Sequence, residues 1–221
     1  MFEQKNLNKL IMVVKRSDLF EKEIFYGFLD SDTTDFKSVI LEKYGWMTRG
    51  FAEEDSNYKQ PIVYCSIVNP KLKKIYAFQR AKKDKNYTEK KLQEKWSLGL
   101  GGHVEQIDDL IIGAVGGDPL NSSMIRELRE EGGLSKSKIE KSQIQGYINI
   151  EDEKLVNLAH FGMLYVIETD LEKLNGKDKE ISKGKFYKIN ELEKMLNSKK
   201  YDFEDWSRVS FNTVKDYVKN L

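Results

Sequence analysis

The chain has 221 residues, of which 39% are hydrophobic and 33% are charged, so it holds enough apolar material for the core of one large domain. Its 37 basic and 36 acidic side chains nearly cancel, which argues against a nucleic-acid binder, because such proteins carry a basic excess. The single cysteine excludes an intrachain disulfide and, with no signal peptide recognised, indicates a cytoplasmic protein. The longest apolar runs are too short to span a bilayer, so no membrane partner is expected.

The first part of the chain predicts strands with one weak helix among them. Residues 9–16 are rich in Val and Ile and predict a strand, whereas residues 34–45 are a weak helix candidate. Residues 46–60 resemble a connecting loop. Residues 61–69 and 73–81 are strand-like runs on either side of the turn signal "PKL", which predicts a hairpin.

The middle of the chain is polar and rich in glycine. Residues 82–95 are almost all polar and predict a solvated loop or helical surface. Residues 96–105 predict a short strand that breaks into a glycine turn. Residues 107–118, "IDDLIIGAVGGD", predict a loop, because their glycines argue against a continuous helix.

Residues 119–131 form the clearest predicted helix. Asp118 is a good N-cap, and Pro119 suits the first helical position. Gly132 and Gly133 mark the end of the helix, because one of them can take the left-handed conformation that stops it.

The last part of the chain predicts three strands and two helices. Residues 143–150 and 155–169 flank the polar turn "EDEK" and predict a second hairpin. Residues 184–189 predict a strand, and residues 190–200 and 205–220 predict helices.

This order of elements indicates the architecture. Strands outnumber helices and the clearest helix lies between hairpins, which is typical of an α/β (α+β) fold with a mixed β-sheet sandwiched between helices. No convincing linker is found. We therefore expect a single domain over residues 1–221, with an N-terminal extension of about residues 1–60 packed on it.

Three glutamates crowd the end of the predicted helix. Relative to Glu127, Glu130 lies about 60° to one side and Glu131 about 40° to the other, so the three carboxylates share one face. An exposed helix can carry such a cluster as a solvated patch, at a cost of about a few tenths of a kcal/mol for each like-charge pair. A divalent cation removes that repulsion, and Mg²⁺ and Mn²⁺ prefer oxygen ligands. The helix alone leaves both interpretations open.

The context of these glutamates favours the metal. The segments "GGHVEQID" (101–108) and "RELREEGGL" (126–134) together resemble the Nudix box: Gly, five residues, Glu, seven residues, then Arg-Glu-aliphatic-any-Glu-Glu-any-Gly-aliphatic. The second half agrees at every specified position. Asp108 stands where the motif has Glu, and residues 109–125 number 17 instead of seven, which we interpret as an insertion at 109–118.

The resemblance is to a MutT-type subgroup of Nudix proteins described as phosphoesterases, and it covers about residues 9–218. It implies a metal-dependent hydrolase that cleaves the diphosphate bond of a nucleoside diphosphate linked to another moiety, by water attack at phosphorus. Mg²⁺ or Mn²⁺ would be the cofactor, and a small nucleoside-diphosphate derivative the substrate. Such an ion neutralises phosphate charge and lowers the pKa of a bound water. A homodimer is left open.

The resemblance also implies roles for individual residues of the box. The implied metal ligands are the side chains of Glu127, Glu130 and Glu131 and the backbone carbonyl of Gly101. Either Glu127 or Glu130 would also assist proton removal. Arg126 would orient a carboxylate with its planar fork and would not touch the substrate.

Further residues near the glycine turn are candidates for binding phosphate. They are Gly102, His103 and Glu105, although a structural role is favoured for His103. His160 lies within a predicted strand and reads as a packed histidine, and Cys65 reads as a buried small apolar residue.

A general base from outside the box is a further expectation of the resemblance. The candidates are acidic residues of the predicted hairpin turn and one of the following strand: Glu151, Asp152, Glu153 and Glu168. A run of acids in a turn is more often simply solvated.

Two other functions compete with hydrolysis. A catalytically silent Nudix-fold sensor of a nucleotide or ADP-ribose would be favoured by loss of the box carboxylates, but all three helix glutamates are retained. An isopentenyl-diphosphate isomerase needs a catalytic cysteine in a setting rich in Cys and His, which Cys65 in its apolar strand lacks.

Overall fold

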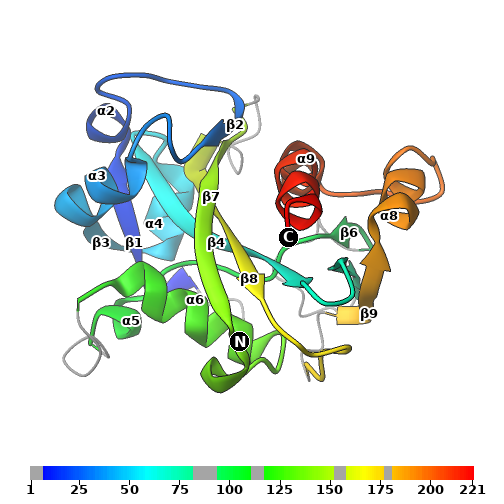
Figure 1. Cartoon of the computed structure of the whole chain (residues 1–221). Coiled ribbons are helices and arrows are strands. Elements are labelled where there is room, and N and C mark those ends of the chain that lie inside the picture. Colours follow the sequence, from blue (N-terminus) through cyan, green and yellow to red (C-terminus); the bar gives the residue numbers. More distant parts are fainter. Residues whose placement is uncertain (1–6, 82–93, 111–116, 152–157, 177–180) are drawn as a thin grey trace. The chain divides into compact units, whose positions relative to one another are not determined.

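The computed structural model describes residues 7–81, 94–110, 117–151, 158–176 and 181–221 (Figure 1). Contacts within the chain divide it into two compact units. The first consists of Met1–Val63, Gly102–Arg126 and Gln145–Leu164, and the second of Tyr64–Gly101, Glu127–Ile144 and Tyr165–Leu221. The expectation of a single domain with an N-terminal extension stays a prediction.

Among the described residues, nine strands form one mixed sheet, so the fold is α+β as predicted. Six strands follow the order β2-β7-β8-β4-β1-β3, while β5 pairs with β4, β6 and β9. The bounds of the strands are β1 Leu10–Lys15, β2 Gly27–Asp30, β3 Gly45–Thr48, β4 Tyr58–Asn69, β5 Lys74–Arg80, β6 Trp96–Ser97, β7 Lys141–Asn149, β8 His160–Glu168 and β9 Ile181–Lys188.

The helices of the described ranges fall between these strands (Figure 1). Their bounds are α2 Arg16–Leu19, α3 Phe36–Lys43, α4 Arg49–Glu54, α5 Gln106–Leu110, α6 Pro119–Glu130, the 3₁₀ helix η2 Lys136–Lys138, α8 Ile189–Leu196 and α9 Asp205–Lys219. None of these helices is long and apolar enough to cross a membrane.

The first unit has an aromatic core. Strand β1 pairs antiparallel with β3 and β4, and β2 pairs antiparallel with β7. Phe36 from α3 lies at the centre of the core, with its ring centroid 5.1 Å from that of Tyr147 and 5.3 Å from that of Phe161. Phe20 and Phe25 complete the cluster with edge-on or tilted contacts to Phe36, which aromatic rings prefer over face-to-face stacking.

The second unit is built around β5. This strand pairs antiparallel with β9 from Lys74↔Lys188 to Arg80↔Ile181, with β6, and with the end of β4. Helix α9 buries Phe211, Val214 and Val218, which recur at the spacing of one helical face. The amphipathic pattern therefore gives α9 one buried stripe and one polar face.

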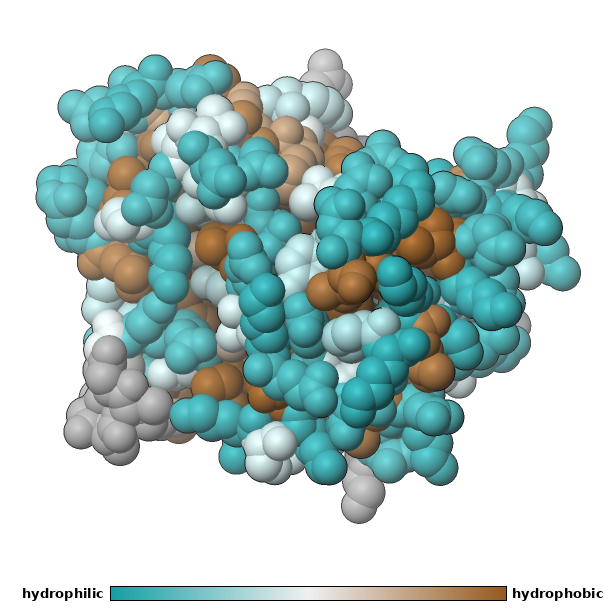
Figure 2. Space-filling view, viewed as in Figure 1, coloured by the Kyte–Doolittle hydropathy of each residue, from teal (hydrophilic) through white to brown (hydrophobic). Residues whose placement is uncertain are grey.

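On the face of the molecule shown in Figure 2, hydrophilic residues predominate and hydrophobic ones are scattered among them. This pattern fits a chain in which 33% of the residues are charged. Single exposed apolar side chains are normal on a folded protein and do not by themselves mark a site.

Most of the predicted elements are confirmed, with ends that differ by a few residues. They are the strands predicted at 9–16, 61–69, 73–81, 143–150 and 184–189 and the helices predicted at 34–45, 119–131, 190–200 and 205–220. The hairpin of β4 and β5 is confirmed by the pair Val68↔Ile75.

Two predicted loops were wrong in part. Residues 46–60 contain most of β3, all of α4 and the start of β4, which are short elements that leave no periodic pattern in the sequence. Residues 106–110 form α5, so the expected loop at 107–118 begins as a helix. Residues 111–116, 152–157 and most of the polar stretch 82–95 lie outside the described residues.

The aromatic core predicts a large stability difference between two phenylalanines. Phe36→Ala removes a ring that is 1% exposed, so the free energy of unfolding should fall by about 3–5 kcal/mol. Phe51→Ala is the control, because Phe51 is 72% exposed and its loss should change stability by less than about 0.5 kcal/mol. Urea denaturation measures both. Equal effects would contradict the packing described for α3.

Candidate functional site

Helix α6 carries the box glutamates, and local interactions define both of its ends. At its start, Oδ1 of Asp118 accepts a hydrogen bond from the backbone N–H of Leu120 at 3.0 Å, as an N-cap does. At its end, Gly133 has a φ of 64°. This left-handed conformation lets the backbone N–H of Leu134 donate to the carbonyl of Leu128 at 2.9 Å. The predicted cap and stop are confirmed.

Two box glutamates and the glycine turn come together in the second unit. The backbone N–H of Gly101 donates to Oε2 of Glu131 at 2.9 Å. Glu127 is 9% exposed, so its carboxylate faces the interior. Burial raises the pKa of the Cys65 thiol well above its usual value, and the negative charges of Glu127 and Glu131 raise it further. Both carboxylates therefore lie close to the same buried thiol.

Glu130 lies at the outer edge of this group. Its side chain is 53% exposed, and its carboxylate lies 3.8 Å from a guanidinium nitrogen of Arg129. Of the three box glutamates, Glu127 is buried, Glu131 is partly buried, and Glu130 borders the solvent.

The glycine turn needs glycine at two positions. A Cβ on Gly99 would lie 2.4 Å from the ring of Tyr64, so no side chain fits there. Gly101 has a φ of 145°, which side chains rarely adopt. Cys65 and Leu100 exchange backbone hydrogen bonds of 2.7 and 3.0 Å, which fix the turn against β4. The backbone of Gly101 can therefore approach Glu131 closely.

The donor set fits a magnesium-like ion. Within the described ranges, no group of three or more His, Cys, Asp or Glu side chains is arranged to hold a metal. Mg²⁺ commonly keeps several waters and binds through only one or two carboxylates. Glu127 and Glu131, with the carbonyl of Gly101, offer hard oxygen donors of that kind. The buried Cys65 lies near them, but its raised thiol pKa disfavours the thiolate that a metal would need.

A buried glutamate next to this turn has no signal in the sequence. Glu204 is 5% exposed. Its Oε1 accepts hydrogen bonds from the hydroxyls of Ser97 and Tyr64, the latter at 3.0 Å, and its Oε2 lies 3.3 Å from Nε of Arg80. Nothing in the local sequence distinguishes Glu204, because its partners are far away along the chain.

A serine of α9 extends this network to the strand that leads into the turn. Oγ of Ser207 accepts from the backbone N–H of Leu98 at 2.9 Å, and Oγ of Ser97 lies 2.9 Å from the carbonyl oxygen of Gly99. The start of α9 therefore holds residues 97–99 in place by hydrogen bonds.

Arg126 and Asp108 form a buried ion pair in the first unit. Nε of Arg126 donates to Oδ1 of Asp108 at 2.8 Å, and Nη2 donates to Oδ2 at 2.9 Å. Asp108 is fully buried, and its Oδ2 also accepts from the backbone N–H of Glu105. Asp108, which stands where the motif has the longer Glu, thus binds the arginine of the box. This contact fits the orienting role implied for Arg126.

The geometry of His103 favours a structural role over phosphate binding. Its side chain is 8% exposed, and its Nε2 lies 2.7 Å from Oε1 of Gln60. Its ring centroid lies 5.1 Å from that of His160. Burial lowers the pKa of His103 well below its usual value, and the charge of Arg49 lowers it further. The ring is therefore neutral near pH 7 and has lost the charge that would attract phosphate.

Three other candidate residues have partners within the chain. Oε1 of Glu105 lies 2.6 Å from Nζ of Lys9. The carbonyl of Gly102 accepts a backbone hydrogen bond from β4. Glu168 accepts a 2.5 Å hydrogen bond from the hydroxyl of Tyr217, which favours a packing role for it.

The candidate base Glu151 is held in an ion-pair cluster in the first unit. Its two carboxylate oxygens lie 2.5 and 2.6 Å from the guanidinium nitrogens of Arg16, and Nζ of Lys59 lies 3.1 Å away. Burial opposes ionisation, but these cations outweigh it and lower the pKa of Glu151 to about 2. Such a carboxylate is a weak base near neutral pH, so the geometry disfavours that role. Asp152 and Glu153 lie outside the described residues.

Comparison with known proteins identifies the family. No protein-family model matches the chain. Protein YmaB of Bacillus subtilis (strain 168) is 32% identical over 191 residues, which cover 84% of this chain and 88% of that protein. The crystal structure of Tm1382, titled a "putative Nudix hydrolase", is 25% identical and covers 95% of this chain and 100% of its own, with a TM-score of 0.73.

A more distant structure agrees on the fold alone. The Nudix domain of Shewanella oneidensis NrtR, solved with ADP-ribose, is 10% identical, covers 72% of this chain and 88% of its own, and gives a TM-score of 0.50. The mixed sheet, the glycine turn and the glutamate-bearing helix define a Nudix-type protein. The similarity to Tm1382 over 95% of the chain places this protein with the Nudix hydrolases, so the resemblance found in the sequence is confirmed.

The Asp108–Arg126 pair predicts a large loss of stability when its charge is removed. Asp108→Asn removes the charge of the fully buried carboxylate that accepts two hydrogen bonds from Arg126, whose side chain is only 12% exposed. The free energy of unfolding should fall by about 3–5 kcal/mol, as when other buried pairs are broken. The control is Asp32→Asn at an exposed turn, which should change it by less than about 0.5 kcal/mol. Urea denaturation measures both free energies of unfolding. A loss in Asp108→Asn no larger than the loss in the control would contradict the importance of this ion pair.

The lowered pKa of Glu151 predicts an acid-sensitive contribution to stability. The pKa falls from 4.5 in the unfolded chain to about 2 in the folded protein, so the unfolded state binds the proton first as the pH drops. The stabilisation is complete above pH 4.5 and is lost as the pH falls towards 2. Glu151→Gln should make the urea midpoint depend less on pH over this window, whereas Glu140→Gln, at an exposed position, should not change that dependence. An unchanged profile in Glu151→Gln would refute the ion-pair assignment.

Proposed function

We propose that the protein is a hydrolase, dependent on Mg²⁺ or Mn²⁺, that cleaves the diphosphate bond of a nucleoside diphosphate linked to another moiety, by water attack at phosphorus. The single observation that carries the proposal is the hydrogen bond from the backbone N–H of Gly101 to Glu131, near the buried Cys65 thiol whose pKa Glu127 and Glu131 both raise. A divalent cation bound by both carboxylates would offset the repulsion between their charges. The similarity to Nudix proteins supports the same conclusion.

The proposed roles are those that the resemblance to the Nudix box implies, and the contact of Gly101 with Glu131 supports them. Glu127, Glu131 and the carbonyl of Gly101 hold the ion, and Glu130 contributes from the solvent side. The Gly101 N–H keeps the carboxylate of Glu131 in a fixed orientation. A bound divalent ion would neutralise the diphosphate and lower the pKa of the attacking water.

Proton removal from water falls to a carboxylate of the same group. Glu127 and Glu130 are the proposed candidates, as the resemblance to the Nudix box implies. Arg126 is a positioning residue that acts through its pair with Asp108. Of the candidates outside the box, Asp152 and Glu153 stay predictions.

The proposed substrate is a small nucleoside-diphosphate derivative. The NrtR Nudix domain, solved with ADP-ribose, supports this class, and ADP-ribose is therefore a suitable first compound to test. We also propose that the protein acts in the cytoplasm, because its one cysteine, Cys65, is a buried free thiol, which suits a reducing compartment.

Replacement of one carboxylate tests the proposal. Glu131→Gln keeps an oxygen that can accept the Gly101 N–H but removes one negative charge. Mg²⁺-dependent hydrolysis should fall about 10²–10³-fold, because a group that stabilises charge in the transition state is lost. The measurement is product release from a panel of nucleoside diphosphates, including ADP-ribose, with Mg²⁺ and with Mn²⁺. The melting temperature should not fall, because removing one charge lowers the repulsion between carboxylates on α6.

The control for this experiment is Glu140→Gln, which removes an exposed glutamate outside the box and should leave the rate unchanged. An active Glu131→Gln protein with normal metal dependence would place the chemistry elsewhere. A wild-type protein that binds these compounds tightly and never cleaves them would instead favour the sensor alternative.

A further inference from the structure

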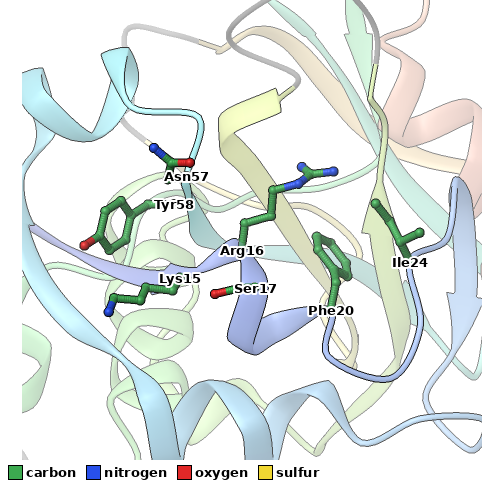
Figure 3. A pocket seen from close by; sticks show the side chains of 7 residues that line it. All are labelled: Lys15, Arg16, Ser17, Phe20, Ile24, Asn57 and Tyr58. Atoms are coloured by element: carbon green, nitrogen blue, oxygen red, sulfur yellow. The ribbon is translucent and has the colours of Figure 1, made fainter.

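The first unit contains a pocket that the hydrolase proposal does not use. Its volume is about 490 Å³, within the range of roughly 300–1,000 Å³ that is usual for small-molecule sites. Side chains from the end of β1, from α2 and the segment after it, and from the start of β4 surround it (Figure 3). The lining residues are Lys15, Arg16, Ser17, Phe20, Ile24, Asn57 and Tyr58.

The two charged residues that line the pocket are both cations. The ammonium group of Lys15 makes no hydrogen bond or ion pair with any residue of the described ranges. The nearby carboxylates of Asp18 and Asp55 accept hydrogen bonds from the side chains of Ser17 and Asn57. An anion in the pocket would therefore meet an ammonium group that has no competing partner among the residues that the structure describes.

Buried charge behind the pocket adds to this positive character. Arg16 and the fully buried Lys59 share the carboxylate of Glu151, so two cations face one anion. Burial lowers the pKa of Lys59 to about 8, and the charge of Glu151 only partly opposes this. Near neutral pH the cluster of Arg16, Lys59 and Glu151 keeps an excess of positive charge.

The rest of the lining offers a fixed aromatic face and an apolar wall. The guanidinium carbon of Arg16 lies 5.3 Å from the centroid of the Phe20 ring, and that ring packs edge-on against Phe161 at 5.9 Å. Phe20 is therefore held in one orientation. Ile24 is 56% exposed, and Figure 3 shows it beside Phe20, while Tyr58 lies beside Lys15.

We propose that this pocket binds a small anion that carries a flat ring, of which a nucleoside monophosphate is the simplest biological form. Lys15 and the charge of Arg16 receive the phosphate, and Phe20, Ile24 and Tyr58 provide the surface for the ring. The site shares no residue with the proposed metal site, so binding here needs neither a divalent ion nor the box glutamates.

The test is calorimetric titration of the full chain in EDTA with three probes: AMP, adenosine and ribose 5-phosphate. AMP should bind, and the two fragments should each bind more weakly, because each lacks one half of the recognised chemistry. Lys15→Met keeps the length of the side chain but removes its charge, and should weaken AMP binding about tenfold. The control is Lys43→Met, which removes an ammonium whose side chain is 49% exposed on α3, and it should bind AMP normally.

The same titration on Glu131→Gln separates this proposal from the hydrolase proposal. Unchanged AMP binding in that variant supports an independent site, whatever its activity. No binding of AMP to the wild-type chain would overturn the proposal. So would equal AMP affinity in Lys15→Met and Lys43→Met, or a loss of affinity in Glu131→Gln. Failure of diphosphate hydrolysis with AMP binding retained would overturn the proposed function alone.

Discussion

The candidate site depends on one hydrogen bond, in which the backbone N–H of Gly101 donates to the carboxylate of Glu131 at 2.9 Å. The bond requires two backbone segments to approach without side chains between them. A Cβ on Gly132 would lie 2.9 Å from the side chain of Leu100, and Gly133 takes the left-handed conformation that ends α6. The glycines of the box therefore allow the turn at Gly101 and the end of α6 to approach each other closely. This close approach positions the carboxylate of Glu131.

Buried ion pairs stabilise the surroundings of the box within each unit. In the first unit, Arg126 grips Asp108 through two hydrogen bonds. In the second unit, Arg80 pairs with Glu204, which also accepts hydrogen bonds from the hydroxyls of Ser97 and Tyr64. Removing one partner of such a pair leaves a buried charge, which costs far more than the intact pair contributes. Loss of one partner in either network should therefore destabilise the segments that the network connects.

The sequence was sufficient to predict α6 and its glutamates, because the signals are local. Asp118 and Pro119 begin the helix, two glycines end it, and the helical turn angle places the glutamates on one face. It was also sufficient for the family, since the second half of the box matches fully.

Other parts could not be read from the sequence, for reasons of length and distance. Helix α4 has six residues, less than two turns, and so shows no periodic pattern. Glu204 lies 107 residues from its partner Ser97, and no local signal marks it as buried. The structural role of His103 depends on its contact with Gln60, which lies 43 residues away in the sequence. Contacts of this kind appear only when the chain is folded.

The most direct test of the account is the position of Mn²⁺ in crystals of the protein, read from its anomalous scattering. The account predicts a peak within coordination distance of carboxylate oxygens of both Glu127 and Glu131 and next to the carbonyl of Gly101. A fully occupied Mn²⁺ bound by other residues, with these two carboxylates left without metal, would contradict it.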